Sequence, residues 1–550
     1  MGERPNGNGV ALPVRILFSF PGVGDKGKGK WILFCLVAAG WLLSSCSLAA
    51  RPDQAETPAA SLTLVAATIA PTITASATAS PIPSIPDPLT PQPTSLPPTS
   101  TLLPDPPTPT PTPLVAPDTR YHLQVLFDYT QHYLKVEEQI AYTHAIPETT
   151  SELVFLVEAN RFPGSFQLGQ LSWGDGSLVE SFALQGNRLA IALPQPLDYG
   201  GGIELNISYE LNLPEIPPPA EENRPQPYGY TSRQTNLVDW YPVLPPYRPG
   251  EDWLAHAPGY FGEHQVYQSA EYQVEIELKD PPSSEQPLVI AASAPAETVG
   301  DLYRYEIQGA RNFAWSASNV YNISTAQVGD VTIQSYAFPF GGVGGAAALQ
   351  NAAEAVRLYS KLYGPYPQRS LSIIEADFLD GMEYEGMFFL SRGFYNLYDG
   401  TPAGYLTAIA VHETAHQWWY GLVGNDQALE PWLDEALCTY SEKLFYEYTY
   451  PELVDWWWGF RVNYFQPTGF VNGTVYEYNG FLPYRNAVYL RGAQFLEALR
   501  QAVGDEAFFA FLRDYAAQKA HGQATADDFF AILKVHSSAD IEPLLQEYFK

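Results

Sequence analysis

The sequence predicts an α+β protein in which an antiparallel β-domain, residues 118–330, is followed by a mainly helical domain, residues 331–550. Three features of the sequence predict this order. The first part has an alternating pattern of apolar and polar residues, the second has a helical period, and residues 46–117 have a composition that cannot bury a core. The alternating pattern consists of short runs bounded by Pro, Gly and Asp, with clear examples at residues 121–127, 189–193 and 272–278. Alternation with a period of two is typical of strands that bury one face.

The helical period begins after residue 330. Residues 346–363 have helical spacing, and helical patterns dominate from Tyr405 to the end. Between them, residues 371–374 and 387–390 form short apolar runs that predict strands. A domain with a few strands and a majority of helices is typical of the α+β class.

The front of the chain predicts an export signal. Within residues 1–45, a Lys-rich segment precedes a thirteen-residue apolar run from Trp31 to Leu43, and small residues lead to Cys46. This order is typical of secretory signals, and an apolar run of that length is too short to span a bilayer comfortably. The arrangement is similar to bacterial lipoprotein signals, which implies cleavage before Cys46 and a lipid anchor on it. An ordinary signal peptide and a short uncleaved anchor are the alternatives.

Residues 46–117 predict a disordered tether. They are mostly Pro, Thr, Ser and Ala and include no aromatic residue, so they cannot bury a core. At about 3.1 Å per residue in an extended, proline-rich conformation, the segment could hold the folded part as far as roughly 200 Å from the anchor. Together with the signal, it predicts a membrane-anchored lipoprotein outside the cytoplasm, at the cell surface or in the periplasm.

Charge and cysteine use narrow the range of partners. The formal net charge is −31, whereas nucleic-acid binding depends on Lys and Arg side chains that neutralise phosphates, so we expect no nucleic-acid partner.

Cys35 lies in the signal and Cys46 carries the predicted anchor, which leaves Cys438 and no intrachain disulfide in the mature protein. We expect Cys438 to be a small buried core residue, with a role at a metal as the alternative.

The strongest chemical signal is His412-Glu413-Thr414-Ala415-His416, followed after eighteen further residues by Glu435. Residues four apart project from one face of a helix, so His412 and His416 can bind one Zn²⁺ per chain while Glu413 acts as a general base. Glu435, at the start of a second helical pattern, would complete a His₂Glu ligand set with the fourth position left for water.

The helical context supports this interpretation. Residues 405–411 lead into the motif with no Pro or Gly and Gln417-Trp418-Trp419-Tyr420 follows it, so we expect a buried helix that stops at Gly421. Two ordinary core histidines, without a metal, are the alternative.

Several motifs resemble the gluzincin aminopeptidase family, that of aminopeptidase N and the leukotriene hydrolases. The resemblance rests on the zinc motif with Gln417-Trp418-Trp419 after it, on Trp432-Leu433-Asp434-Glu435, on Gly381-Met382-Glu383 and on Tyr489-Leu490-Arg491-Gly492. The chain departs from the family's Gly-x-Met-Glu-Asn motif at Asp380 and Tyr384, and from its Tyr-x-Lys-Gly motif at Arg491.

This resemblance implies a saddle-like β-domain followed by a thermolysin-like catalytic domain, and we expect the long C-terminal helical domain of many members to be absent. It also implies that Tyr489 stabilises the oxyanion, with Tyr476, Tyr478 and Tyr484 as rivals. Glu442, seven residues beyond Glu435, would either orient a zinc histidine or be a surface residue.

The resemblance further implies a substrate-binding role for Glu383, presented with Gly381 and Met382 just before a predicted edge strand. Its carboxylate would bind the free α-ammonium group of a peptide. A solvated loop carboxylate is the alternative.

These observations together predict a membrane-tethered zinc aminopeptidase that acts on peptides with a free N-terminus. The alternatives are a zinc endopeptidase, a relative with added epoxide-hydrolase activity, and a catalytically idle surface-binding protein of the same fold. The retained Glu383 argues against an endopeptidase. The complete ligand set with Glu413 and Tyr489 argues against an idle protein.

Overall fold

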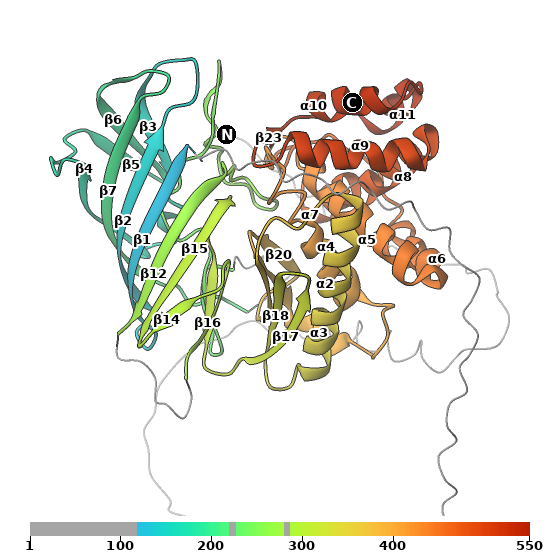
Figure 1. Cartoon of the computed structure of the whole chain (residues 1–550), viewed down its shortest axis with the longest axis horizontal. Helices are drawn as coiled ribbons and strands as arrows, with labels where there is room; N and C mark the ends of the chain where they lie inside the picture. The colour runs from blue at the N-terminus through green and yellow to red at the C-terminus, as the bar shows by residue number, and fades with distance from the viewer. Residues whose placement is uncertain (1–117, 219–226, 280–286) are drawn as a thin grey trace, which may run out of the picture. The chain divides into compact units, whose positions relative to one another are not determined.

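The computed structural model describes residues 118–218, 227–279 and 287–550 of the chain. The predicted signal, the tether and Cys46 lie outside these residues. In the described part, a strand-rich region is followed by a helix-rich region, as the colour order in Figure 1 shows. The predicted α+β class and the order of its two parts are confirmed.

A seven-stranded sheet forms the centre of the strand-rich region. Its strands are β1 (Thr119–Asp128), β2 (Tyr133–Thr143), β4 (Phe166–Trp173), β7 (Gly202–Asn212), β12 (Ala270–Leu278), β14 (Glu297–Val299) and β15 (Leu302–Ala310). They lie in the order β14-β15-β12-β1-β2-β7-β4 and are antiparallel to their neighbours, except for the parallel pair β1 and β12. Along β1, Leu123 and Val125 are buried and Gln124 is exposed, so the period of two reflects one buried face.

Smaller sheets surround this one. They are a three-stranded sheet, β3-β6-β5, a four-stranded sheet, β13-β16-β9-β8, and a two-stranded sheet, β10-β11. Their bounds are β3 (Thr150–Leu156), β5 (Phe182–Gln185), β6 (Arg188–Leu197), β8 (Gly229–Tyr230), β9 (Thr235–Leu237), β10 (Tyr247–Arg248), β11 (Asp252–Trp253), β13 (Val289–Ala292) and β16 (Trp315–Ser318). A short 3₁₀ turn, η1 (Glu158–Arg161), follows β3.

The helix-rich region contains a five-stranded sheet with the order β17-β18-β19-β21-β20. Its strands are β17 (Asn322–Val328), β18 (Val331–Ala337), β19 (Ser370–Ala376), β20 (Gly381–Tyr384) and β21 (Met387–Ser391). The three central strands are parallel, and the two edge strands are antiparallel to their neighbours. Strand β17 falls on the β-domain side of the predicted boundary at residue 330, yet it pairs with this second sheet.

Both faces of the second sheet are buried, which explains its continuous apolar runs. Met387 and Phe389 pack into the core shared with the strand-rich region, whereas Phe388 and Leu390 pack against the helices. A strand covered on both sides shows no polar alternation. The side chains on one face of the sheet therefore pack against the strand-rich region, and those on the other face pack against the helices.

The helices pack on one side of this sheet, with α2 and α4 against its strands and α5 and α8 beyond them (Figure 1). Their bounds are α2 (Gly342–Leu362), α3 (Arg392–Leu397), α4 (Tyr405–Ala415), α5 (Trp432–Thr449), α6 (Val454–Trp457), α7 (Phe481–Arg485), α8 (Gly492–Val503), α9 (Asp505–Gln518), α10 (Ala526–His536) and α11 (Glu542–Tyr548). Short segments complete the region: β22 (Gly424–Asn425), β23 (Gln523–Ala524), η2 (Pro451–Leu453), η3 (Trp458–Val462), η4 (Asn463–Phe465) and η5 (Asn486–Arg491).

The expected continuation of the zinc-motif helix to Tyr420 is wrong, because α4 ends at Ala415. Beyond it the backbone forms wider turns, in which the Gly421 N–H donates to the His416 carbonyl at 2.8 Å. Tyr420 adopts a left-handed conformation (φ 130°) that reverses the chain. The buried Arg311 side chain donates to carbonyl groups of this turn, those of Tyr420, Gly421 and Leu422.

No helix in the described ranges combines the length and the apolar character that a membrane span needs.

Candidate metal centre and active site

The predicted zinc ligands converge from two helices. His412 lies in the last turn of α4 and His416 caps that helix in a right-handed helical conformation, so their imidazoles share one face. Helix α5 begins directly after Pro431, and Glu435 lies in its first turn, where the helix dipole favours a carboxylate. All three ligand side chains are buried.

The distances between the ligand atoms fit a zinc ion. His412 Nε2 and His416 Nε2 are 3.2 Å apart, and they lie 3.2 and 3.6 Å, respectively, from Glu435 Oε2. Ligand atoms at about 2.0–2.1 Å from a tetrahedral Zn²⁺ lie about 3.3–3.4 Å from one another. The three atoms, called the zinc triangle below, are therefore spaced like three corners of a zinc tetrahedron.

Hydrogen bonds outside the zinc triangle determine which ring nitrogens face it. His412 Nδ1 lies 2.9 Å from Glu442 Oε1, and His416 Nδ1 lies 3.1 Å from the carbonyl oxygen of Trp419. Both partners are acceptors, so both Nδ1 atoms carry the proton. The Nε2 lone pairs then face each other and a carboxylate, an arrangement that a metal ion between them satisfies.

Glu442 is fixed behind His412. It is buried and accepts hydrogen bonds from Arg461 Nε and Nη2 at 2.8 Å each and from Trp457 Nε1 at 3.0 Å. Burial opposes its ionisation, but Arg461 and His412 outweigh that effect and hold the pKa of Glu442 below its ordinary value. Glu442 is thus an ionised acceptor for His412, and its interpretation as a surface residue is wrong.

Glu413 borders the zinc triangle next to β20. Its Oε2 atom is buried and has no hydrogen-bond partner among the described residues. Gly381 makes room for it, because a Cβ atom at that position would come within 2.6 Å of the Glu413 carboxyl carbon. Burial raises the pKa of Glu413 to about 8, and His412 and His416 only partly offset this effect. A divalent cation bound nearby would favour the ionised form.

Tyr489 reaches the same ligand set from η5, a π-helical turn, a geometry frequent at functional sites. Its hydroxyl donates a hydrogen bond to Glu435 Oε1, and its ring is stacked on His412 with centroids 6.1 Å apart.

The rival tyrosines differ in position. Tyr476 and Tyr478 donate to the carbonyl groups of Ala257 and Phe470. The Tyr484 hydroxyl is buried without a hydrogen-bond partner in the described part of the chain, and its ring lies 5.7 Å from that of Tyr489.

Glu383 lies within edge strand β20 and not in a loop before it, so the alternative of a solvated loop carboxylate is wrong. Its Oε1 accepts a hydrogen bond from Gln427 Nε2 at 3.3 Å, and the same nitrogen donates to Asp434 Oδ2 at 3.0 Å. Burial raises the pKa of Glu383. Met382 is half-buried beside it.

Glu263 was not predicted as a site residue. Its carboxylate oxygen lies within 4.8 Å of those of Glu383 and Glu435. The side chain comes from a loop of the strand-rich region, more than a hundred residues before the zinc motif. Gln427 was missed as well, and neither residue belongs to a local pattern that indicates a site.

Cys438 is buried, as expected, and its thiol donates to the Trp419 carbonyl at 3.7 Å. Among the described residues, His412, His416 and Glu435 form one of three groups of potential metal ligands, and none of the three includes Cys438.

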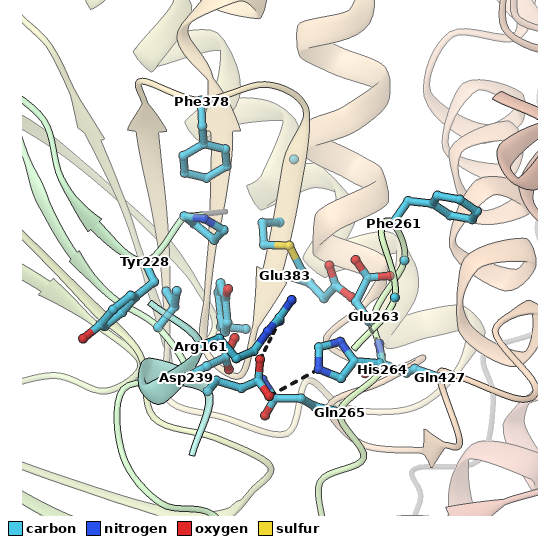
Figure 2. Close-up of a pocket in the computed structure, with 18 of the residues that line it drawn as sticks. Arg161, Tyr228, Asp239, Phe261, Glu263, His264, Gln265, Phe378, Glu383 and Gln427 are labelled. Carbon is cyan, nitrogen blue, oxygen red and sulfur yellow. Dashed lines mark hydrogen bonds and ion pairs between the residues drawn. The ribbon is translucent and has the colours of Figure 1, made fainter. Parts of the chain in front are cut away.

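A pocket of about 140 Å³ lies beside the centre, and Glu383 and Glu263 are in its lining. Figure 2 shows these two carboxylates close together and, below them in the view, Arg161, Asp239 and His264. The pocket thus extends from the second sheet into loops of the strand-rich region. His264 lies in the pocket wall.

A family model described as the peptidase family M1 domain matches residues 347–548. This part of the chain resembles peptidase family M1. Aminopeptidase M1-D of Oryza sativa subsp. japonica and aminopeptidase M1 of Arabidopsis thaliana are each 25% identical to the chain over 222 residues, 38% of its length. The chain spans 25%, about a quarter, of the length of these relatives.

Solved M1 structures share the two-domain fold. An M1 zinc metallopeptidase from Deinococcus radiodurans superposes with a TM-score of 0.54 at 18% identity, covering 78% of this chain and 93% of that one. A two-domain M1 zinc metallopeptidase mutant bound to L-arginine gives a TM-score of 0.56 at 18% identity, with the same coverage of 78% and 93%. The zinc triangle therefore lies within a fold that solved structures share.

Proposed function

We propose that this protein is a zinc aminopeptidase that removes N-terminal residues from peptides. The observation that carries the proposal is the position of Glu383 and Glu263, whose carboxylates lie beside the zinc triangle and Glu413. The matching M1 family model and the relatives named as aminopeptidases support it. A structure of the same fold was solved with a Tyr-Ser-Ala substrate.

The metal chemistry belongs to His412, His416 and Glu435. They would hold a Zn²⁺ ion, which would supply Lewis-acid chemistry to the scissile carbonyl and lower the pKa of a water molecule toward about 7. Glu413 accepts the proton of the attacking water and passes it to the leaving amine. The Tyr489 hydroxyl, already directed at the ligand set, donates a hydrogen bond to the oxyanion.

The second set of carboxylates determines which peptides fit. A free α-ammonium group placed between Glu383 and Glu263 would neutralise the negative charge of these carboxylates, which is unfavourable in a buried site. The hydrogen bond from Gln427 holds Glu383 in position. The peptide bond that follows the first residue then lies next to the zinc triangle. A chain segment continuing on the N-terminal side would meet these carboxylates without a positive charge, so the arrangement favours an aminopeptidase over an endopeptidase.

Glu383→Ala tests this assignment. We expect the variant to retain zinc and to cut free peptides at least about tenfold less well by kcat/KM, while cleavage of N-acetylated peptides changes little. Glu452→Gln, an exposed substitution in η2, is the matched control. An equal loss for free and acetylated peptides would assign Glu383 a structural role and contradict the proposal.

We also propose that the enzyme is a lipoprotein outside the cytoplasm, anchored through Cys46 and held away from the membrane by residues 46–117. The signal-like segment and the Pro-rich composition support this proposal. Cys46→Ala should move the protein from the detergent phase to the aqueous phase, whereas Cys35→Ala should not. A Cys46→Ala protein that fractionates with membranes as the parent does would indicate an uncleaved anchor.

A further inference from the structure

Asp239 lies in the wall of the pocket that also holds Glu383. It follows strand β9 and is half-buried, with its side chain at the pocket surface. Its Oδ1 accepts a hydrogen bond from the Tyr267 hydroxyl. Within the described part of the chain, no cation is paired with this carboxylate at salt-bridge distance.

The backbone holds Asp239 rigidly. Its neighbours Val238 and Trp240 are buried in the core, and Asp239 itself adopts a left-handed conformation with φ 50°. Aspartate and asparagine tolerate this conformation better than most residues, and such strained positions cluster at functional sites. The carboxylate is therefore presented to the pocket by a fixed segment.

The nearby Arg161 does not neutralise Asp239, because it is already engaged. Arg161 Nη1 lies 2.7 Å from Glu158 Oε2, and His264 Nε2 lies 3.3 Å from Glu158 Oε1. Burial opposes the ionisation of Glu158, but His264 and Arg161 outweigh it and hold the pKa of Glu158 below its ordinary value. Glu158 and Arg161 thus form a closed ion pair next to Asp239.

The charge balance of the pocket is negative. Its lining includes the carboxylates of Glu158, Asp239, Glu263 and Glu383 and a single guanidinium, that of Arg161. An acidic substrate side chain would add a further negative charge, so the pocket disfavours it. Burial raises the pKa of Asp239 to about 6, although His264 and Arg161 oppose this effect, so the group is ionised at neutral pH.

The remaining walls are largely aromatic, including Phe162, Tyr228 and Phe378. The volume of about 140 Å³ is similar to that of cavities that hold one benzene molecule, about 150 Å³. One long side chain fits such a space, with its apolar stem against the rings and its end at a carboxylate. A purely apolar side chain would fill the same space but would leave Asp239 desolvated and unpaired.

We infer that this pocket receives the side chain of the substrate's N-terminal residue and that Asp239 selects side chains that end in a cation. This inference rests on the proposed aminopeptidase function. The preferred substrates are peptides that begin with arginine or lysine. Asp239 is a specificity-determining residue and takes no part in bond breaking.

Arginine and citrulline substrates test the inference in the unmodified enzyme. The two side chains have nearly the same shape, and only arginine is charged. With zinc-loaded enzyme and matched aminoacyl substrates, we expect kcat/KM for arginine to exceed that for citrulline by at least about tenfold. Equal values for the two substrates would overturn the inference whether or not any variant folds.

The Asp239→Asn variant tests the role of the negative charge alone, because asparagine tolerates the left-handed conformation and still accepts the hydrogen bond from Tyr267. We expect kcat/KM to fall about 10- to 100-fold for arginine and to change less than about threefold for norleucine. Asp252→Asn is the matched control, since Asp252 is also left-handed but is exposed and lies outside the pocket lining.

The outcomes separate this inference from the proposed function. Cleavage of norleucine substrates with an unchanged arginine-to-norleucine ratio in Asp239→Asn would overturn the inference alone. Absence of turnover for every free-amine substrate would overturn the aminopeptidase function, and the inference with it.

Discussion

Glu413 and Tyr489 both lie at the zinc triangle, but they interact with it differently. One buried oxygen of the Glu413 carboxylate has no hydrogen-bond partner among the described residues, whereas the Tyr489 hydroxyl donates to Glu435, a predicted metal ligand. The first is suited to move a proton and the second to stabilise a developing charge. Substitutions that keep the shape of each side chain should separate these roles.

Glu413→Gln should retain zinc and lose about 10²–10⁴ in kcat, because the amide cannot accept the proton of the attacking water. Metal content by elemental analysis and steady-state kinetics check this expectation. Loss of zinc in step with activity would instead mean that Glu413 supports the metal.

Tyr489→Phe should lower kcat roughly 10²–10³-fold with little change in zinc content or KM, as expected when an oxyanion donor is removed. The comparison variant is Tyr484→Phe, whose buried hydroxyl has no partner among the described residues. Near-normal turnover in Tyr489→Phe together with a large loss in Tyr484→Phe would transfer the role to Tyr484.

For single residues, the spacing within one helix and the start of a second helical pattern were enough to predict that His412, His416 and Glu435 would lie together. Glu263, Gln427 and Asp239 could not be predicted in the same way. They lie in loops or irregular turns, and the fold, not a local period, brings them to the pocket.

Helices α4 and α5 carry the three predicted metal ligands. An apolar run without Pro or Gly was enough to predict α4, but its end was misplaced. That end is set by tertiary contacts, since Arg311 from the strand-rich region binds the carbonyl groups that follow. Local sequence contains no information about such a distant partner.

The contact between α5 and α4 through Glu442 should determine zinc affinity. Glu442→Gln weakens the acceptor for His412 Nδ1 and leaves Arg461 with a neutral partner, so we expect zinc to bind about 10- to 100-fold more weakly. Competition with a chelator measures the affinity, and Glu452→Gln is the control. An unchanged zinc affinity would show that Glu442 serves only the packing of α5.

On the scale of the whole molecule, the second sheet joins the two regions, and Glu375 is a buried carboxyl group on its strand β19. Burial raises the pKa of Glu375 to about 7, although its Oε2 accepts a hydrogen bond from the Phe338 N–H at 2.8 Å. Unfolding restores an ordinary pKa near 4.5. Between these values the unfolded state releases its proton first, so this group lowers stability as the pH rises from about 4.5 to 7.

Glu375→Gln keeps an acceptor for Phe338 and removes the titration. We expect the variant to gain about 1–2 kcal/mol in free energy of unfolding at pH 8 relative to the parent, and much less at pH 5. Urea unfolding of the zinc-loaded protein at both pH values measures this difference. The same difference at both values would contradict the assignment.

The measurement that most directly tests the aminopeptidase function is kcat/KM of the zinc-loaded enzyme for one peptide with a free and with an acetylated N-terminus. Acetylation removes the charge that Glu383 and Glu263 are placed to bind, so the blocked peptide should be cut at least about thirtyfold less well. Comparable values for the two forms would contradict the account and indicate an endopeptidase.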